Sequence, residues 1–232
     1  MRWSTVGERK MACEHYRLRR DPKSSHQQIA RLLKELRPQQ VLDVGAAQGI
    51  LGQLLADSGI TIDAIEPNPD WAEAAKPYYR RVVNSTVEAA DLPDNTYDCI
   101  VCADVLEHLP DPLSTLKRLR QAAKPDATFI ISLPNVAHLA VRAMLLFGRF
   151  PRMERGILDK THLQFFTKDT AKNLLSDAGL KVDRTLTTIV PLEDFGNGLF
   201  TKTMMGMQRL AVAALPRLFA MQWIFIAKPI PQ

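Results

Sequence analysis

The stretch VLDVGAAQG, residues 41–49, decides the fold class of this chain. Its first four residues form a short apolar run, the pattern of a buried strand, and lead directly into a turn that holds Gly45 and Gly49. Residues 50–57 then have the spacing of a helix. A strand, a turn of small residues and a helix are typical of the first unit of an α/β fold, because small residues let the turn's backbone approach a ligand.

The same alternation continues on both sides of this stretch. Upstream, Ser24 and Ser25 are expected to cap a helix that ends at Pro38. Alternating strands and helices predict a mostly parallel sheet with helices on both faces. We expect further strands at residues 61–66, 81–83, 97–103, 128–133, 182–190 and 221–227, and further helices at residues 69–76, 112–123 and 167–178.

Two segments interrupt the alternation. Residues 135–164 are long for a connection and contain a helix-like apolar stretch, so we predict a helical lid that covers the substrate. Residues 199–219 are apolar, but Lys202, Arg209 and Arg217 argue against a membrane span. We expect a core-packed or amphipathic helix there, and contact with a membrane surface is the less favoured alternative.

Composition and charge limit the classes of function. The 232 residues, 46% of them hydrophobic, predict one domain at residues 24–232 after a basic arm at residues 1–23. The formal net charge is +5, but the basic residues are spread along the chain, so we expect no nucleic-acid partner. The arm lacks the apolar core of a signal peptide, and three cysteines make no disulfide framework, which together predict a cytoplasmic location.

Two of the cysteines, Cys99 and Cys102, are spaced as C-x-x-C within an expected strand. Side chains three residues apart in a strand point to opposite faces. We therefore predict two buried thiols and no metal site at this motif.

Acidic residues stand where ligands bind in such a fold, outside the carboxyl ends of the strands. Asp43 ends the first strand, and Glu66 ends the second, where a carboxylate can accept two hydrogen bonds from a ribose diol. Dinucleotide-binding proteins use a similar turn and acid, but their pattern is G-x-G-x-x-G, and Ala47 replaces its second glycine here. Asp43 would also repel a phosphate, so a nucleotide-dependent oxidoreductase is disfavoured.

Three stretches together resemble a known family. DVGAAQG at residues 43–49, IDAIEPNP at 62–69 and YDCIVCADVLEHLPDP at 97–112 are similar, in content and spacing, to the first three signature regions of class I S-adenosylmethionine-dependent methyltransferases. ISLPN at 131–135 and DKTHLQFFTKDTAKNLLSDAGL at 159–180 resemble the later part of the subgroup that methylates small molecules. The resemblance spans about residues 24–229.

The resemblance implies a Rossmann-like, doubly wound sheet of seven strands, mostly parallel with an antiparallel last strand, and S-adenosyl-L-methionine as cofactor. Two positions depart from the family's pattern: Ala47 replaces a common glycine, and Thr86 stands where an aspartate often binds the adenine amino group. Glu88 is the candidate to compensate. By position, the resemblance places around the cofactor Asp43, Gly45, Ala46, Gly49, Glu66, Pro67, Thr86, Val87, Glu88, Ala103 and Asp104.

The predicted reaction is methyl transfer to a small-molecule acceptor, of sugar, lipid-linked or natural-product type, with O-methylation favoured. A hydroxyl acceptor benefits from a general base, for which histidine suits neutral pH. The candidates are His108, His138 and His162. We favour His162, because it lies at the end of the predicted lid and resembles a recurrent feature of the subgroup.

Two alternatives to this function stay open. Ala47 and Thr86 permit a non-catalytic member of the family that serves as a partner subunit. A nucleic-acid methyltransferase fits the positive charge, but enzymes that flip a base for amino methylation resemble an N-P-P-Y pattern after the fourth strand. This chain has ADVL there, at residues 103–106.

Overall fold

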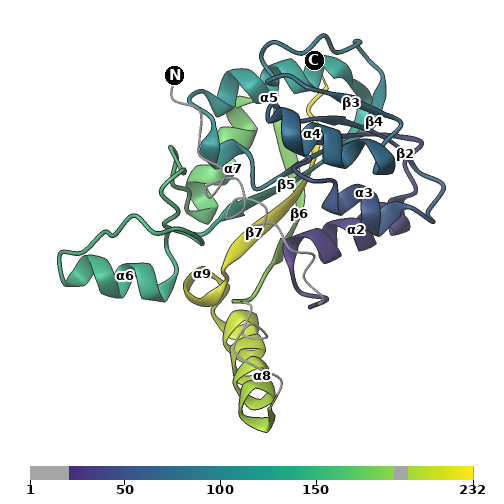
Figure 1. Ribbon diagram of the computed structural model, residues 1–232. Coiled ribbons are helices and arrows are strands. Elements are labelled where there is room, and N and C mark those ends of the chain that lie inside the picture. The colour runs from purple at the N-terminus through teal and green to yellow at the C-terminus, as the bar shows by residue number, and fades with distance from the viewer. Residues whose placement is uncertain (1–20, 191–197, 232) are drawn as a thin grey trace.

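The computed structural model describes residues 21–190 and 198–231, and a seven-stranded sheet forms its centre (Figure 1). The strand order is β3-β2-β1-β4-β5-β7-β6, and only β7 runs antiparallel to its neighbours. This confirms the predicted Rossmann-like sheet. The strands are β1 (Gln40–Val44), β2 (Thr61–Ile65), β3 (Arg81–Val83), β4 (Tyr97–Ala103), β5 (Ala123–Pro134), β6 (Leu180–Thr187) and β7 (Gln222–Pro229).

Helices cover both faces of the sheet, as predicted (Figure 1). They are α2 (Ser25–Leu36), α3 (Ile50–Leu55), α4 (Pro69–Ala75), α5 (Pro112–Ala122), α6 (Leu139–Leu146), α7 (Lys168–Asp177), α8 (Leu199–Ala214) and α9 (Pro216–Phe219). Two short 3-10 helices, η1 (Lys76–Tyr78) and η2 (Leu106–His108), follow α4 and β4. Most of the predicted basic arm, including Cys13, lies outside the described residues.

Some predicted boundaries were wrong. Ser24 occupies the N-cap position of α2, but its side chain makes no capping hydrogen bond, and its hydroxyl is buried without a partner in the described structure. Strand β5 begins at Ala123, five residues before the predicted start, because its first residue pairs with Tyr97 across a register shift in β4. Strand β6 lies at Leu180–Thr187, where residues 182–190 were expected.

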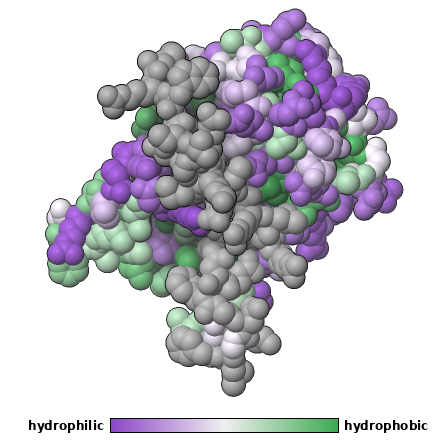
Figure 2. Space-filling view, in the orientation of Figure 1, coloured by the Kyte–Doolittle hydropathy of each residue, from purple (hydrophilic) through white to green (hydrophobic). Residues whose placement is uncertain are grey.

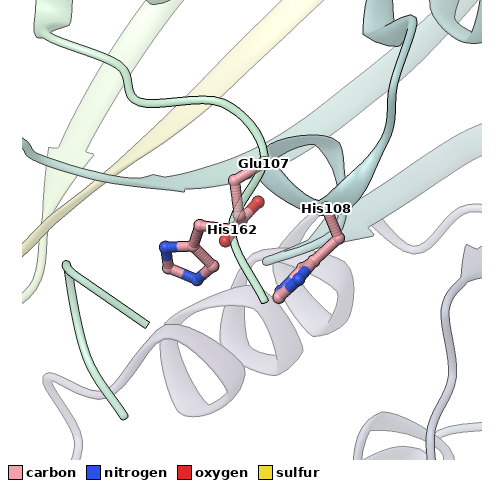
Figure 3. Close-up of side chains that lie close together, drawn as sticks. All are labelled: Glu107, His108 and His162. Atoms are coloured by element: carbon pink, nitrogen blue, oxygen red, sulfur yellow. The ribbon is translucent and has the colours of Figure 1, made fainter. Parts of the chain in front are cut away.

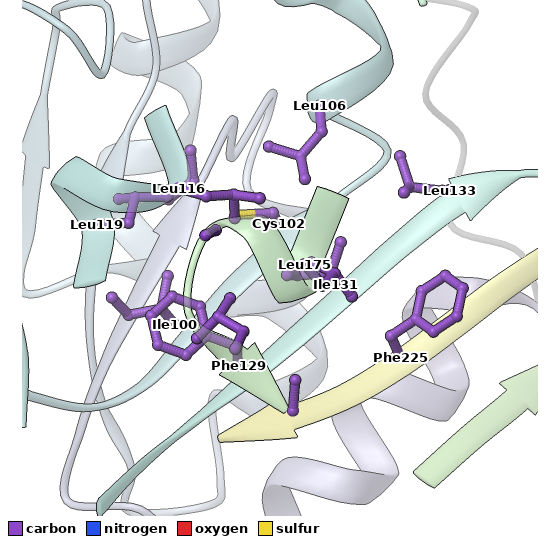
Figure 4. Close-up of a cluster of buried hydrophobic side chains, with 14 of the residues drawn as sticks. Ile100, Cys102, Leu106, Leu116, Leu119, Phe129, Ile131, Leu133, Leu175 and Phe225 are labelled. Atoms are coloured by element: carbon purple, nitrogen blue, oxygen red, sulfur yellow. The ribbon is translucent and has the colours of Figure 1, made fainter. Parts of the chain in front are cut away.

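The sheet separates two hydrophobic cores. On one face, Leu116 of α5 and Leu175 of α7 pack on Phe129 and Phe225 of the sheet (Figure 4). On the other face, α2 and α3 pack on a second set of strand residues. Cys102 belongs to the first core and Cys99 to the second, and both are buried free thiols. The prediction that this pair faces opposite sides of the sheet is therefore confirmed.

The two interrupting segments both contain the expected helices. Helix α6 projects from the body of the molecule, and Figure 2 shows that its surface is largely apolar. Within residues 139–158, Val141, Ile157 and Leu158 form a small separate cluster, and Met221 of the body packs against it. Helix α8 also projects outward, and of its described side chains only Met205 and Val212 pack on the core. Of the two kinds of helix expected there, the core-packed one was therefore wrong for most of its length. Among the described residues, no helix is long and apolar enough to cross a membrane.

Candidate active site

Two cavities meet at the carboxyl ends of the parallel strands. The larger, of about 980 Å³, is lined by the turn after β1, the end of β2, the loops after β3 and β4, and residues 154 and 159–161 of the predicted lid. The smaller, of about 230 Å³, lies between the start of α2, helix η2 and residues 155–162. Asp104, His108, Asp159 and Thr161 line both cavities, so the two spaces adjoin.

The turn after β1 has the backbone that its glycines predict. Gly45 and Gly49 have φ values of 73° and 85°, in the left-handed region that favours glycine. A Cβ at Gly45 would lie 2.6 Å from Cγ2 of Val105, so glycine is needed for the turn to pack against the loop after β4. Ala47 also adopts a left-handed conformation, with φ of 47°. The alanine therefore accepts the backbone of a glycine, at a strain of about 1 kcal/mol.

Glu66 joins this turn to the end of β2. It is only 3% exposed, and its Oε2 and Oε1 accept hydrogen bonds from the backbone N–H groups of Ala47 and Asn68, each at 2.8 Å. Burial raises the pKa of Glu66, and the two backbone hydrogen bonds oppose this. Each carboxylate oxygen keeps a further lone pair. Since Glu66 also lines the larger cavity, it can still accept hydrogen bonds from a ligand's hydroxyls.

Asp43 lies behind the turn and is not among the described residues that line either cavity. Its carboxylate is 3% exposed and accepts a hydrogen bond of 2.6 Å from the Tyr79 hydroxyl, which in turn accepts one from the backbone N–H of Gly52. Burial raises the pKa of Asp43 to about 7; the Tyr79 hydrogen bond opposes the shift, and the charge of Glu66 adds to it. Asp43 therefore ties β1, through Tyr79, to α3 and to the residue that follows η1.

The structure brings most of the predicted cofactor residues to the larger cavity. Glu88 is there, and its Oε1 accepts a hydrogen bond of 3.2 Å from the Thr115 hydroxyl. Gly45, Glu66, Pro67, Thr86, Val87 and Asp104 line the cavity too, whereas the described lining does not include Asp43, Ala46, Gly49 or Ala103. Sequence reasoning missed the apolar wall made by Trp71, Val105 and Leu109; the aromatic residue in the first turn of the helix after Glu66 was the available signal.

Asp104 is held at the junction of the two cavities. Its Oδ1 accepts hydrogen bonds from the Ser132 hydroxyl at 2.6 Å and from Nε2 of Gln222 at 2.9 Å. Its backbone is left-handed, with φ of 58°, which aspartate tolerates better than most residues. Such strain is common where a side chain must be aimed at a ligand.

A cluster of Glu107, His108 and His162 lies beside Asp104 (Figure 3). One ligand atom from each of the three side chains lies within 4.8 Å of the others. Glu107 is 1% exposed, and neither of its carboxylate oxygens has a hydrogen-bond partner among the described residues. Burial raises the pKa of Glu107 well above its usual range, and the nearby Asp104 adds to this shift.

The two histidines of the cluster are oriented by backbone carbonyls. Nδ1 of His162 lies 3.1 Å from the carbonyl oxygen of Ile157, and Nδ1 of His108 lies 3.3 Å from that of Thr161. Because a carbonyl oxygen only accepts, each Nδ1 must carry the proton in these hydrogen bonds. Burial lowers the pKa of His162, and His108 adds to this.

Backbone hydrogen bonds explain why His162 lies beside Glu107. The N–H groups of Leu163 and Gln164 both donate to the carbonyl oxygen of Glu107, at 2.7 and 2.9 Å. The end of the predicted lid is thereby fixed to the loop after β4. Sequence reasoning singled out both histidines but missed Glu107, whose only signal was its place in the E-H doublet.

The third histidine candidate lies apart from this cluster. His138 precedes α6, and its Nδ1 accepts a hydrogen bond of 3.2 Å from the backbone N–H of Ala140, as an N-cap. Burial lowers its pKa. It is not among the described residues that line either cavity, so the structure brings His108 and His162 together without His138.

Comparisons with known proteins agree with this architecture. A family model described as a methyltransferase domain matches residues 15–185. The ubiquinone biosynthesis O-methyltransferase of Vibrio cholerae is 33% identical over 102 residues, which are 41% of this chain and 42% of that protein. The alignment thus spans less than half of the relative's length.

Solved structures share the fold over nearly the whole chain. A SAM-dependent methyltransferase from Thermotoga maritima has a TM-score of 0.64 at 18% identity and covers 97% of this chain and 96% of its own. The 1,6-didemethyltoxoflavin-N1-methyltransferase of Burkholderia thailandensis, solved with 1,6-didemethyltoxoflavin and S-adenosylhomocysteine, has a TM-score of 0.62 at 17% identity, and the match covers 100% of this chain and 93% of its own. At these identities, the likeness shows the fold alone.

Proposed function

The chain belongs to the methyltransferase-domain family, with S-adenosylmethionine as its cofactor, and we propose that it transfers the cofactor's methyl group to a hydroxyl oxygen of a small-molecule acceptor. The observation that carries the proposal is the junction of two cavities at Asp104 and His108. A methyl donor in one cavity and an acceptor in the other would meet there, and catalysis of this kind depends largely on such alignment.

The larger cavity suits the cofactor. Glu66 offers free lone pairs to the ribose hydroxyls, and Trp71, Val87 and Leu109 give the apolar surface that an adenine needs. When bound, S-adenosylmethionine supplies an electrophilic methyl group, which is the difficult part of the chemistry. Thr86 and Glu88 line the same space, so Glu88 is the residue that we assign to the adenine end in place of the family's usual aspartate.

The smaller cavity suits part of a polar acceptor. Its walls carry hydroxyl and amide groups from Ser25, Thr188 and Gln222, which can hydrogen-bond to the acceptor's own hydroxyls. Its volume of about 230 Å³ admits a group about the size of one ring, so we assign it a single sugar-sized or aromatic portion of the acceptor. The V. cholerae relative, named as an O-methyltransferase, supports oxygen as the acceptor atom.

The cluster of Glu107, His108 and His162 would remove the proton of the acceptor hydroxyl. Its two histidines face the junction, since His108 lines both cavities and His162 lines the smaller one. Residues 154 and 159–161 cover the larger cavity and would exclude water during transfer.

Isothermal titration with S-adenosylhomocysteine tests cofactor binding first. We expect micromolar binding that Glu66→Ala weakens about tenfold or more, the scale of one charge-assisted hydrogen bond. Glu73→Ala is the matched control, because Glu73 is an exposed acid of α4 paired with Lys76 and outside both cavities. If the wild-type protein bound neither S-adenosylmethionine nor S-adenosylhomocysteine, the chain would be a non-catalytic partner subunit and the proposal would be wrong.

Methyl transfer is then measured with radiolabelled S-adenosylmethionine against a panel of sugars, lipid-linked intermediates and phenolic compounds. We expect label on oxygen for an active acceptor. His162→Ala should abolish turnover while S-adenosylhomocysteine binding stays within about twofold of wild type, because His162 lines only the smaller cavity. Unchanged turnover would remove His162 from the mechanism.

A further inference from the structure

We propose that the acceptor carries an ammonium group on the same ring-sized portion as the hydroxyl to be methylated, and that Asp21 binds this ammonium group in the smaller cavity. Amino sugars and phenols with an alkylamine side chain belong to this class. The proposal rests on the proposed function, because it names the class of acceptor that the same site takes. Sequence reasoning placed Asp21 in the basic arm and gave it no role.

The side chain of Asp21 is the first argument. Asp21 lines the smaller cavity and is only 5% exposed. Its Oδ1 accepts a hydrogen bond of 2.7 Å from the backbone N–H of Lys23, but its Oδ2 is buried without a hydrogen-bond partner among the described residues. The hydroxyl of Ser24, in the same wall, is unpartnered as well. Buried polar atoms in this state are unfavourable, and a ligand that donates hydrogen bonds to them would remove the cost.

The other polar groups of the cavity offer a ligand mainly hydrogen-bond acceptors. The Ser25 hydroxyl and Nε2 of Gln222 both donate to Asp104, at 3.5 and 2.9 Å. The Thr188 hydroxyl donates to Oε1 of Gln222 at 3.1 Å. Since these donors point to acceptors within the protein, a ligand meets chiefly lone pairs on this wall. A ligand that is rich in donors therefore fits the cavity best.

Charge favours an ammonium group over a neutral hydroxyl. Asp21, Asp104 and Asp159 all line this cavity. Arg155 lines it too, but its side chain is exposed and donates no hydrogen bond to the unpartnered oxygen of Asp21. A hydroxyl would satisfy that oxygen as a donor but leave the charge of the carboxylate unpaired. An ammonium group offers three donors together with a positive charge, and charge-assisted hydrogen bonds are the stronger ones.

The two groups of such an acceptor would meet different walls of the cavity. Asp21 lies just before α2, whereas the proton-removing cluster of Glu107, His108 and His162 comes from η2 and from the end of residues 135–164. The space between these walls, about 230 Å³, admits about one ring. An acceptor bound across the cavity would place its ammonium group at Asp21 and its hydroxyl at the cluster, which keeps the role proposed above.

Isothermal titration with matched pairs of ligands tests the proposal. Glucosamine is compared with glucose, and tyramine with tyrosol, because the members of each pair differ only in an ammonium group against a hydroxyl. Each ligand is titrated into the whole chain, with and without S-adenosylhomocysteine, at a pH where both amines are protonated. We expect the amine of at least one pair to bind about tenfold or more tightly than its partner, the scale of one charge-assisted hydrogen bond.

Asp21→Asn removes the charge and keeps the shape of the side chain. Asparagine can still accept the hydrogen bond of the Lys23 N–H, and unchanged S-adenosylhomocysteine binding verifies that the variant is folded. We expect the preference for the amine to be lost, with the affinity for the hydroxyl partner within about twofold of wild type. Asp57→Asn is the matched control, because it makes the same change of charge at an exposed acid outside both cavities, so the preference should remain.

The outcomes separate this proposal from the proposed function. Equal affinities in both pairs, amines that do not bind, or a preference that survives Asp21→Asn would overturn the ammonium site. Methylation of an acceptor without an amine would in that case still uphold the proposed function. Conversely, a preference that Asp21→Asn abolishes, in a protein that does not bind S-adenosylhomocysteine, would overturn the proposed function and leave the ammonium site standing.

Discussion

The free energy of unfolding of the wild-type protein should fall as the pH rises, because of Asp43, and replacing Asp43 by asparagine should abolish this fall. Burial raises the pKa of the Asp43 carboxyl from 3.8 to about 7 in the folded protein. Between these values the folded state holds a proton that the unfolded state has released, so the free energy of unfolding falls as the pH rises from about 4 to about 7 and is then constant. The asparagine side chain does not titrate, and its amide oxygen can still accept the hydrogen bond of Tyr79.

The expected size of the effect follows from the width of this window. Each pH unit inside it changes the free energy of unfolding by about 1.4 kcal/mol per group. From about pH 5 to about pH 7, the variant should therefore gain about 2 to 3 kcal/mol relative to wild type. Subtracting the two curves largely cancels the contributions of the other carboxyl groups, including Glu66.

Urea unfolding followed by circular dichroism, at pH steps across this range and without cofactor, measures the difference. Tyr79→Phe is the companion variant, because it removes the hydrogen bond that opposes the raised pKa of Asp43 and should move the window to higher pH. If the curves of wild type and Asp43→Asn ran parallel, Asp43 would titrate alike in both states, and the account of its buried environment would be wrong.

Three further predictions concern helix α3, the turn after β1 and the end of β2. Gly52→Ala should lower the free energy of unfolding by about 1 to 3 kcal/mol in urea titrations, because the added Cβ would lie 2.8 Å from the backbone oxygen of Tyr78; a neutral effect would mean that this backbone shifts freely. Ala47→Gly should relieve the left-handed strain at φ of 47° and change stability by at most about 1 kcal/mol, measured the same way; a larger loss would contradict this backbone. Glu66→Gln should lower the free energy of unfolding by about 1 to 3 kcal/mol, because the new amide nitrogen would face one of the two backbone N–H donors that the carboxylate now accepts from. Calorimetry without cofactor checks this, and an unchanged melting temperature would refute it.

Local patterns predicted most of the fold. Apolar runs, helical spacing and the glycines at 45 and 49 determine the backbone conformation of the few residues around them. The strand β1 and the turn after it lie where these patterns predicted them. The opposite faces of Cys99 and Cys102 followed from the geometry of a strand alone. For helix α8 the apolar residues left a core-packed and an amphipathic helix open, and the core-packed alternative was wrong, because Met207 and Leu210 are exposed in the structure.

The sequence by itself therefore determined the order of strands and helices, the turn after β1 and the acid at the end of β2. Only the tertiary structure decided that Asp43 faces Tyr79, 36 residues away, and that Glu107 lies beside His162. The reason is physical: strands, helices and turns are set by neighbouring residues, whereas these pairings depend on how distant segments close on the sheet. At the site, two backbone hydrogen bonds from Leu163 and Gln164 to the carbonyl of Glu107 hold the end of residues 135–164 against the loop after β4. No pattern of side chains in the sequence specifies these two hydrogen bonds.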